Sequence, residues 1–580
     1  MVVGKADAVI PSGTAARMAE TLRHRGPDDI QAVELPQAQL GHTRLAVIDL
    51  AGGSQPMTDA DQRAWIVFNG EIFNFRELRA ELTAAGHVFR SQSDTEVLLH
   101  AWLEWGREAP RRLNGQFAMA IWDPQARTLF AARDRLGEKP LYWAATPEGH
   151  LVVASELRAI LASGLVAPRI DPVSVEAFLA LLYVPPDRTI YENIHTLRPG
   201  HWLGWSEAGM TGGCYWSPQY SSAEMSFDEA ADGVREKLAR AVQRQMVADV
   251  PVGAFLSGGL DSSSIVALMA PHASSAVQTF SVGFGDLINE LPFARQVAEM
   301  YRTEHHELQM DIAVGEVLER IAGVYDEPFA DPSNIPTYLV AGFAREQVKV
   351  VLSGDGGDEL FGGYSWYSPR LKECTGLGPA LRRGLGLAAD PWEVHVAAMR
   401  YFLPSESTGL RGGNGTDAVG TALRAAYAPG AGVRAMDRLT DFDLRCYLPG
   451  DILVKVDRAA MAHGLETRAP FLDVELVEFV LSLPWRLRFH GGQLKELLRR
   501  ACAPLWPEAI RTRSKQGFGP PLVRWLERAD VRSLWARVGG DGGRLAELLP
   551  GLPAHRAALG PYQIWPLLCL GLWLENHPTR

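Results

Sequence analysis

Two glycine-rich loops in the middle of the chain contain the residue types that bind phosphate. The first, SGGLDSS at residues 257–263, directly follows the apolar run at 252–256. Paired glycines let the backbone approach an anion closely, and serine hydroxyls together with the N–H groups of a helix start bind phosphate oxygens. No Gly-Lys-Ser or Gly-Lys-Thr follows, so the loop is not a Walker A motif. A tight strand-to-helix turn capped by serine remains the alternative for this loop alone.

The second loop, SGDGGDE at residues 353–359, also follows an apolar run, at 348–352. Two such loops at neighbouring strand ends, with Asp261 and Asp358 close by, suit a polyphosphate with bound Mg²⁺. Protein carboxylates supply one or two ligands to such a magnesium ion, and the phosphates supply others. The pair of loops therefore predicts a nucleotide site.

The composition limits the class of protein. The chain has 580 residues, 47% hydrophobic and 22% charged, which indicates a globular protein of more than one domain. Its net charge of −11 argues against a nucleic-acid partner, which would require a basic face. The five cysteines are scattered, form no CxxC pair and begin only at Cys214, which argues against a disulfide framework and a structural zinc site. No signal peptide or apolar run of ~20 residues is visible, so we expect a reduced, cytoplasmic protein with no membrane partner.

The elements that must position these loops fall into two parts. Residues 1–165 show short apolar runs between turn signals and two predicted helices, at 75–85 and 94–105, which indicates packed β-sheets with helices outside. Residues 166–225 are rich in Pro and Gly and read as a connector. From residue 226 to 580, helices alternate with short apolar strands and then dominate, which predicts a doubly wound parallel sheet with a helical C-terminal part. Within that part, residues 376–430 are rich in Gly and Ala, and we expect some of them to be loosely ordered.

Several longer motifs then point to a family. The loop at 257–263 resembles the pyrophosphate loop of ATP pyrophosphatases, which cleave ATP to AMP and pyrophosphate. The segments DILVKVDR at 451–458, GLETRAPFLD at 464–473 and SKQGF at 514–518 resemble the glutamine-hydrolysing asparagine synthetases. This resemblance covers nearly the whole chain in the family's order. It implies an ATP-dependent carbon–nitrogen ligase that converts aspartate to β-aspartyl-AMP, which ammonia then converts to asparagine.

The resemblance also implies roles for individual residues of the second part. Asp261 and Asp358 would hold Mg²⁺, Asp355 would act on the intermediate, and Lys515 would neutralise phosphate charge in the transition state. Lys495 is a second candidate cation, and a solvated surface lysine is the alternative for both. The residues implied to bind ATP and its pyrophosphate are Leu256, Ser257, Gly258, Gly259, Asp261, Ser262, Ser263, Val282, Ser353 and Gly354.

The first part resembles the family's N-terminal-nucleophile glutamine amidotransferase domain, an α+β sandwich of β-sheets. The matching segments are RHRGPD at 23–28, GHTRLAVID at 41–49, NGE at 69–71, SDTE at 93–96 and ARDRLGEKPLY at 132–142. By position, Arg44 would pair with the α-carboxylate of glutamine and Asp94 with its α-ammonium, while Glu71 lines the pocket. Asn69 and Gly70 would form the oxyanion hole. Surface ion pairing is the alternative for Arg44 and Asp94.

One departure from the family is at the start of the chain. The family begins Met-Cys-Gly, and that cysteine is the nucleophile that attacks the glutamine amide. This chain begins Met1-Val2-Val3-Gly4 and has no cysteine before Cys214. We therefore expect it to use free ammonia rather than glutamine. Either an N-terminal stretch is missing or the thiol has been lost, and the intact glutamine-pocket motifs favour the first explanation.

Three functions remain open at this point. The leading one is an asparagine synthetase with ATP, Mg²⁺, aspartate and either glutamine or ammonia as small-molecule ligands, and family members are often homodimers. The second is a related amidotransferase or a cyclase of the β-lactam or lasso type that acts on another carboxylate. The third is an inactive scaffold, against which the two intact phosphate loops argue.

Overall fold

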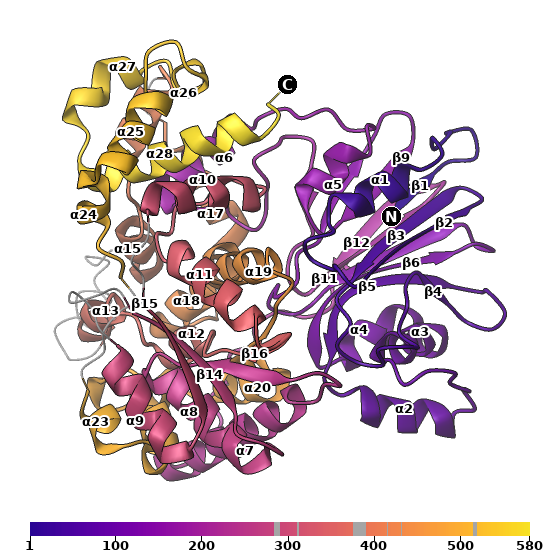
Figure 1. Cartoon of the computed structure of the whole chain (residues 1–580), viewed down its shortest axis with the longest axis horizontal. Helices are drawn as coiled ribbons and strands as arrows, with labels where there is room; N and C mark the ends of the chain where they lie inside the picture. Colours follow the sequence, from indigo (N-terminus) through magenta and orange to yellow (C-terminus); the bar gives the residue numbers. More distant parts are fainter. Residues whose placement is uncertain are drawn as a thin grey trace.

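The computed structural model describes residues 1–283, 290–309, 313–374, 390–413, 416–430, 432–513 and 519–579. Figure 1 shows two parts side by side, with the sheets of the first part on the right and the parallel-sheet and helical parts on the left. No helix in these ranges combines the length and apolar character needed to cross a membrane.

The first part is built from two antiparallel sheets packed face to face. One has the strand order β10-β8-β9-β1-β3-β2 and the other β12-β11-β7-β6-β5-β4. Apolar side chains from both sheets, among them Val3, Leu40, Trp122 and Leu151, fill the layer between them. The strands are β1 (Val2–Gly4), β2 (Asp29–Leu35), β3 (Ala38–Arg44), β4 (Met57–Thr58), β5 (Trp65–Ile72), β6 (Gly115–Asp123), β7 (Thr128–Arg133), β8 (Tyr142–Ala145) and β9 (His150–Ala154).

Helices cover the outer faces of these sheets, as the sequence predicted. Helices α2 (Phe75–Ala84) and α3 (Asp94–Trp105) contribute Leu78, Leu82 and Leu98 to a core shared with β5 and β6. Helices α1 (Thr14–Glu20) and α5 (Leu157–Ala162) pack against the other sheet. The expected sandwich of sheets with external helices is confirmed.

The residues expected to form a connector, 166–225, differ from that prediction. They contain helix α6 (Pro172–Leu181) and strands β10 (His195–Thr196), β11 (His201–Ser206) and β12 (Gly209–Cys214). Strand β11 pairs with β7 along its length, so this segment extends the second sheet. The glycine pair Gly212-Gly213 lies in β12, which is an edge strand of the sheet. The longest stretches of this segment without helix or strand are residues 182–194 and 215–226.

The second part is organised around a five-stranded parallel sheet with the order β15-β14-β13-β16-β17. Its strands are β13 (Val252–Phe255), β14 (Gln278–Gly283), β15 (Glu304–Gln309), β16 (Val350–Leu352) and β17 (Glu466–Arg468). The chain moves outward from β13 in one direction to β15 and then returns to β16 on the other side, so the strand order reverses between β13 and β16. Ligands of such sheets bind at this switch point, beyond the carboxyl ends of the strands. The doubly wound sheet is confirmed.

Helix α7 (Phe227–Gln245) precedes the sheet and begins where the sequence predicted the start of the second part. Ser226 caps it, because its hydroxyl accepts from Glu229 N and the Glu229 carboxylate accepts from Ser226 N. The other helices that shape the site are α8 (Leu260–Met269), α9 (Leu291–Tyr301), α11 (Asn334–Arg345), the π-helix η3 (Asp443–Ile452), α19 (Leu453–Met461), α20 (Val474–Ser482) and α22 (Glu496–Cys502).

Many of the remaining helices form a C-terminal body at the upper left of Figure 1. It includes α10 (Val314–Val324), α25 (Ala529–Val538) and α28 (Pro561–Asn576), which pack on one another. The described residues within 376–430 add α15 (Pro391–Ala398), α16 (Pro404–Leu410) and α17 (Ala418–Tyr427). The expected helical C-terminal part is confirmed.

Candidate active sites

A large cavity of about 1180 Å³ lies at the switch point of the parallel sheet. The two predicted phosphate loops line it, because one follows β13 and the other follows the adjacent strand β16. The cavity also reaches Asp331 after α10, Lys455 on α19 and Lys495 before α22. The sequence-predicted loops therefore meet at one site.

The first loop is tightly packed at the start of α8. Gly258 has φ +68°, and a Cβ there would lie 2.6 Å from Phe293 Cβ and 2.7 Å from the amide nitrogen of Ala294. Ser257 Oγ accepts from Gly259 N at 3.2 Å and lies 3.1 Å from Ser262 Oγ. Two hydroxyls and a helix N-terminus thus converge at the loop, which is an arrangement suited to an anion.

The carboxylates of Asp261 and Asp358 lie beside the same lysine side chain. The ammonium of Lys495 contacts both carboxylates, and its distance to Asp358 Oδ1 is 2.6 Å. Burial opposes the charge of Lys495, but the two carboxylates outweigh burial and raise its pKa. Two converging carboxylates are also the share that a protein contributes to a Mg²⁺ ion bound to polyphosphate. The donor set fits magnesium only together with phosphate ligands, because no group of three or more acidic, His or Cys side chains suited to a metal occurs among the described residues.

A second set of charged groups faces the same cavity beside the second loop. Ser353 Oγ donates to Asp355 Oδ2 at 2.7 Å, and burial raises the pKa of Asp355. Lys455 Nζ donates to Asp331 Oδ2 at 2.8 Å. These groups form a polar end of the cavity that is separate from the Lys495 contact.

The other predicted residues of this site are placed as follows. Leu256 and Val282 line the cavity where adenosine was expected. Ser263 does not: its side chain is fully buried behind α8 and faces away from the cavity. Lys515 lies outside the described residues. Arg513, which the sequence reasoning missed, lines the cavity and donates to Gly258 O at 3.0 Å.

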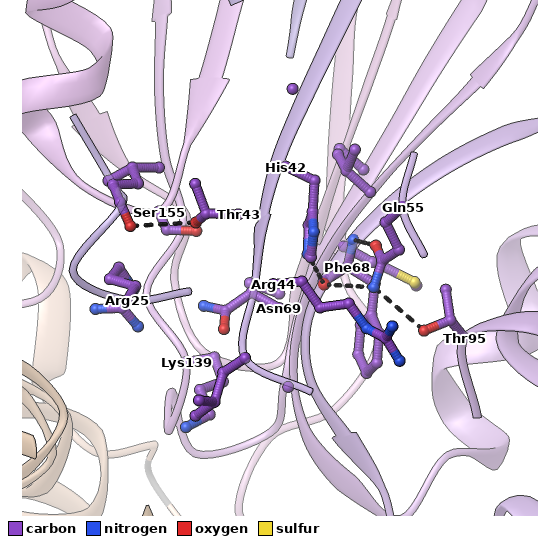
Figure 2. Close-up of a pocket in the computed structure, with 18 of the residues that line it drawn as sticks. Arg25, His42, Thr43, Arg44, Gln55, Phe68, Asn69, Thr95, Lys139 and Ser155 are labelled. Atoms are coloured by element: carbon purple, nitrogen blue, oxygen red, sulfur yellow. Dashed lines mark hydrogen bonds between the residues drawn. The ribbon is translucent and has the colours of Figure 1, made fainter. Parts of the chain in front are cut away.

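A second, smaller cavity of about 140 Å³ opens between the first part and the second (Figure 2). All five predicted glutamine-pocket residues line it: Arg44, Asn69, Gly70, Glu71 and Asp94. Ser93 caps α3 by accepting from Thr95 N, which places Asp94 at the start of the helix and at the cavity. Figure 2 shows Gln55 between Phe68 and Thr95, to which its amide donates.

The anion-binding end of this cavity is rigid. Three backbone carbonyls hold the Arg44 guanidinium, those of Ile48, Asp49 and Leu50. Gly70 has φ +142°, and a Cβ there would overlap the carbonyl of Gln116 on the neighbouring strand. Asn69 Nδ2 is buried and has no hydrogen-bond partner in the described structure, so it retains a donor for a ligand oxygen.

The opposite end collects carboxylates, and two of its residues come from the second part. Asp94 Oδ2 accepts from Ile72 N at 3.0 Å, and burial raises the pKa of Asp94. Burial and the neighbouring Asp94 raise the pKa of Glu71 well above its usual range. Glu71 Oε2 accepts from Arg468 Nη2 at 2.9 Å, and Glu466 also lines the cavity. Glu466 and Arg468 lie in the GLETRAPFLD segment, so the motif was visible in the sequence but its place at this cavity was not.

None of the described residues that line this cavity is a cysteine. A third space of about 10 Å³ lies between the two larger cavities. It shares Lys139 with the smaller cavity and shares Ser353, Asp355 and Val456 with the larger one. The narrow third space therefore lies between the two larger cavities and shares lining residues with both.

Comparison with known proteins gives two family matches. Residues 233–575 match the model described as asparagine synthase, and residues 2–216 match that of a glutamine amidotransferase domain. Asparagine synthetase (glutamine-hydrolyzing) 1 of Bacillus subtilis (strain 168) is 33% identical over 88% of this chain and 84% of its own. Asparagine synthetase (glutamine-hydrolyzing) 3 of the same organism is 34% identical over 90% and 86%. A Penicillium rubens protein named amidase chyE is 29% identical over 87% of this chain and 84% of its own.

Proposed function

The chain belongs to the asparagine synthase family of ATP-dependent ligases, and we propose that it amidates the side-chain carboxylate of aspartate by way of β-aspartyl-AMP. The observation that carries the proposal is the meeting of both phosphate loops, Asp355 and Lys455 at one cavity on the switch point of the parallel sheet. We propose residues 226–580 as the synthetase unit. Residues 1–165 with most of 166–225 form the glutamine-binding unit.

The reaction proceeds in two steps, adenylation of the carboxylate and then its amidation. A carboxylate oxygen of aspartate attacks the α-phosphorus of ATP, and the bond to the bridging oxygen of the β-phosphate breaks, releasing pyrophosphate. Ammonia then attacks the acyl carbon, AMP leaves with the electron pair of the carbon–oxygen bond, and the nitrogen loses a proton. Activation is needed because a carboxylate oxygen is a poor leaving group, whereas AMP is a good one.

The residues of the larger cavity divide this work. The first loop and the start of α8 hold the pyrophosphate portion, with Ser257 and Ser262 donating to its oxygens. Asp261 and Asp358 would hold Mg²⁺, which when bound neutralises phosphate charge. Lys455 and Lys495 present cations to the reacting groups, and Lys515 joins them in this proposal. Asp355 orients the acyl group and accepts the proton that the nitrogen loses.

The 580-residue chain is proposed to take its nitrogen from free ammonia. Its smaller cavity has the donors and carboxylates expected to bind glutamine, but the described lining offers no thiol to attack the amide. Ammonia would reach the adenylate through the narrow space beside Lys139, Ser353 and Asp355. Glutamine then binds to this chain without being cleaved.

The test is pyrophosphate release from ATP and Mg²⁺ with aspartate, in the presence of either ammonium chloride or glutamine. We expect aspartate-dependent pyrophosphate and asparagine with ammonium, and no glutamate with glutamine. The matched control replaces Asp355 by Asn, which keeps the size of the side chain and removes its charge. Absence of aspartate-dependent pyrophosphate would overturn the assigned acceptor. Formation of glutamate would overturn the restriction to ammonia.

One observation favours a second acceptor class. The larger cavity is bordered by a cluster of three aromatic rings, Tyr364, Trp366 and Tyr447, and Tyr364 and Trp366 stack with centroids 4.2 Å apart. Aromatic rings offer apolar contact to an acid larger than aspartate. The same pyrophosphate assay, run with a panel of amino acids and aryl-substituted acids, separates the two acceptors by their relative kcat/KM.

A further inference from the structure

A single guanidinium of the synthetase unit contacts Glu71, a residue that lines the glutamine cavity. Arg468 ends strand β17, and its side chain is fully buried. Its Nη2 donates to Glu71 Oε2 at 2.9 Å, while Nε donates to Glu466 Oε1 at 2.7 Å. Nη1 donates to the backbone carbonyls of Gln245 and Val247, each at 2.7 Å. The Arg468 guanidinium donates four hydrogen bonds in all, so it can move only if one of these four acceptors also moves.

Three carboxyl groups lie around this one guanidinium. Glu71, Asp94 and Glu466 all act on Arg468 and favour its charged form. Glu71 Oε1 is buried and has no hydrogen-bond partner in the described structure. A ligand with an ammonium group would supply a second positive charge and a donor for this oxygen. It would thereby compete with Arg468 for hydrogen bonding to the carboxyl group of Glu71.

The backbone of the same residue supports the second phosphate loop. Arg468 pairs with Leu352 across the parallel strands β16 and β17. Its carbonyl oxygen accepts from Ser353 N at 2.9 Å. Ser353 Oγ in turn donates to Asp355 Oδ2 at 2.7 Å. An unbroken series of contacts therefore runs from Glu71 in one cavity through Arg468 and Ser353 to Asp355 in the other.

We propose that Arg468 is a positioning residue through which an amino acid bound in the glutamine cavity changes the affinity of the synthetase site for ATP. This inference rests on the proposed function, because it assumes an ammonium-bearing ligand in one cavity and ATP in the other. The ligand's ammonium weakens the Glu71–Arg468 contact, and the end of β17 moves the Ser353–Asp355 loop with it. Such coupling is reciprocal, so ATP changes the affinity for glutamine by the same factor.

The test measures both affinities by calorimetry on the full chain, with glutamine and a non-hydrolysable ATP analogue as the probes. In the unaltered protein we expect the dissociation constant of each ligand to change about fivefold or more when the other is saturating. In Arg468→Lys, which keeps the charge but cannot form the fork, we expect each ligand to bind and the factor to fall to about 1. A factor of 1 in the unaltered protein, or the same factor in the variant, would overturn the proposal.

Two further variants keep the test decisive. Lys349→Ala removes another contact between the two units, the ion pair of Lys349 Nζ with Asp28 Oδ2 at 2.8 Å, and should leave the coupling factor unchanged. If Arg468→Lys fails to fold, Glu71→Gln removes the charge at the other end of the contact, and loss of coupling there supports the same role. Failure of glutamine to bind the unaltered protein would instead count against the glutamine cavity itself, which distinguishes the two proposals.

Discussion

Arg25 and Asp457 form a buried two-point ion pair between the two units of the protein. Arg25 Nη1 lies 2.8 Å from Asp457 Oδ2, and Nη2 lies 2.9 Å from Oδ1. The side chains are only 4% and 5% exposed. Arg25 also contacts Glu156, and Asp457 also contacts Arg458. The pair therefore belongs to a charged network that fixes how the glutamine cavity meets the synthetase unit.

Removing one partner of this pair should destabilise the protein strongly. In Arg25→Met, the Asp457 carboxylate loses its two-point partner while it stays buried, and breaking a buried pair in this way costs about 3–5 kcal/mol. Urea denaturation measures the loss in the free energy of unfolding. Lys349→Ala is the control, because its ion pair with Asp28 is partly exposed and should be worth less than about 1 kcal/mol. Equal losses in the two variants would contradict this assignment.

The same ion pair should make a contribution to the free energy of unfolding that is lost in acid. Burial alone would raise the pKa of Asp457, but the Arg25 guanidinium outweighs burial and lowers it to about 2 from 3.8. Because the folded pKa lies below the unfolded one, the stabilisation is complete above about pH 4 and is lost as the pH falls toward 2. We expect this term to be about 2 kcal/mol.

Unfolding free energies at pH 5 and pH 2.5 check this term when the unaltered protein is compared with Asp457→Asn. The unaltered protein should lose more stability over this interval than the variant does. A pH dependence identical in the two proteins would show that Asp457 titrates normally in the folded state.

Glu327 predicts a pH effect of opposite sign. Its carboxylate accepts from Ile190 N at 2.7 Å and from the Tyr142 hydroxyl at 3.3 Å, and burial raises its pKa from 4.5 to about 8. The folded protein then holds a proton that the unfolded chain has lost, so stability falls as the pH rises from about 4.5 to 8. We expect Glu327→Gln to be more stable than the unaltered protein at pH 8, by a few kcal/mol at most, and similar to it at pH 5. Thermal denaturation at both pH values measures this, and a constant difference between the proteins would contradict it.

Gly258 and Gly259 give a matched test of the phosphate loop. In Gly258→Ala the new Cβ would meet Phe293 and the Ala294 backbone, and the residue would have to keep φ +68°, so the loop must shift. In Gly259→Ala the nearest atom is Ser257 Oγ, at 3.2 Å, and φ is −78°. We expect ATP-dependent pyrophosphate release to fall by about a hundredfold or more in Gly258→Ala, since misplacement of ~1 Å has that effect, and by much less in Gly259→Ala. Similar rates for both variants would show that loop geometry does not limit the reaction.

Local sequence was sufficient for the long elements. Helix α7 begins where the sequence predicted the start of the second part, and the structure shows that Ser226 and Glu229 form a capping box there. Strand β15 (Glu304–Gln309) was missed because its sequence, EHHELQ, is polar and lies at a sheet edge. Strand β17 was missed because its three residues are too few to show the alternating pattern of a strand. Its place beside β16 depends on residues more than a hundred positions away.

The sequence alone was enough to identify the family, because the motifs that carry the resemblance all rest on residues that are close together along the chain. What remained for the tertiary structure was which of these groups act together. Glu71 and Arg468 are 397 positions apart and meet only because β17 carries Arg468 to the wall behind the other unit's cavity, where it contacts Glu71. Ser263 belongs to the right motif but faces away from the site, because helix α8 turns its side chain into the core. Contacts of this kind follow from the packing of sheets and helices, which no local pattern encodes.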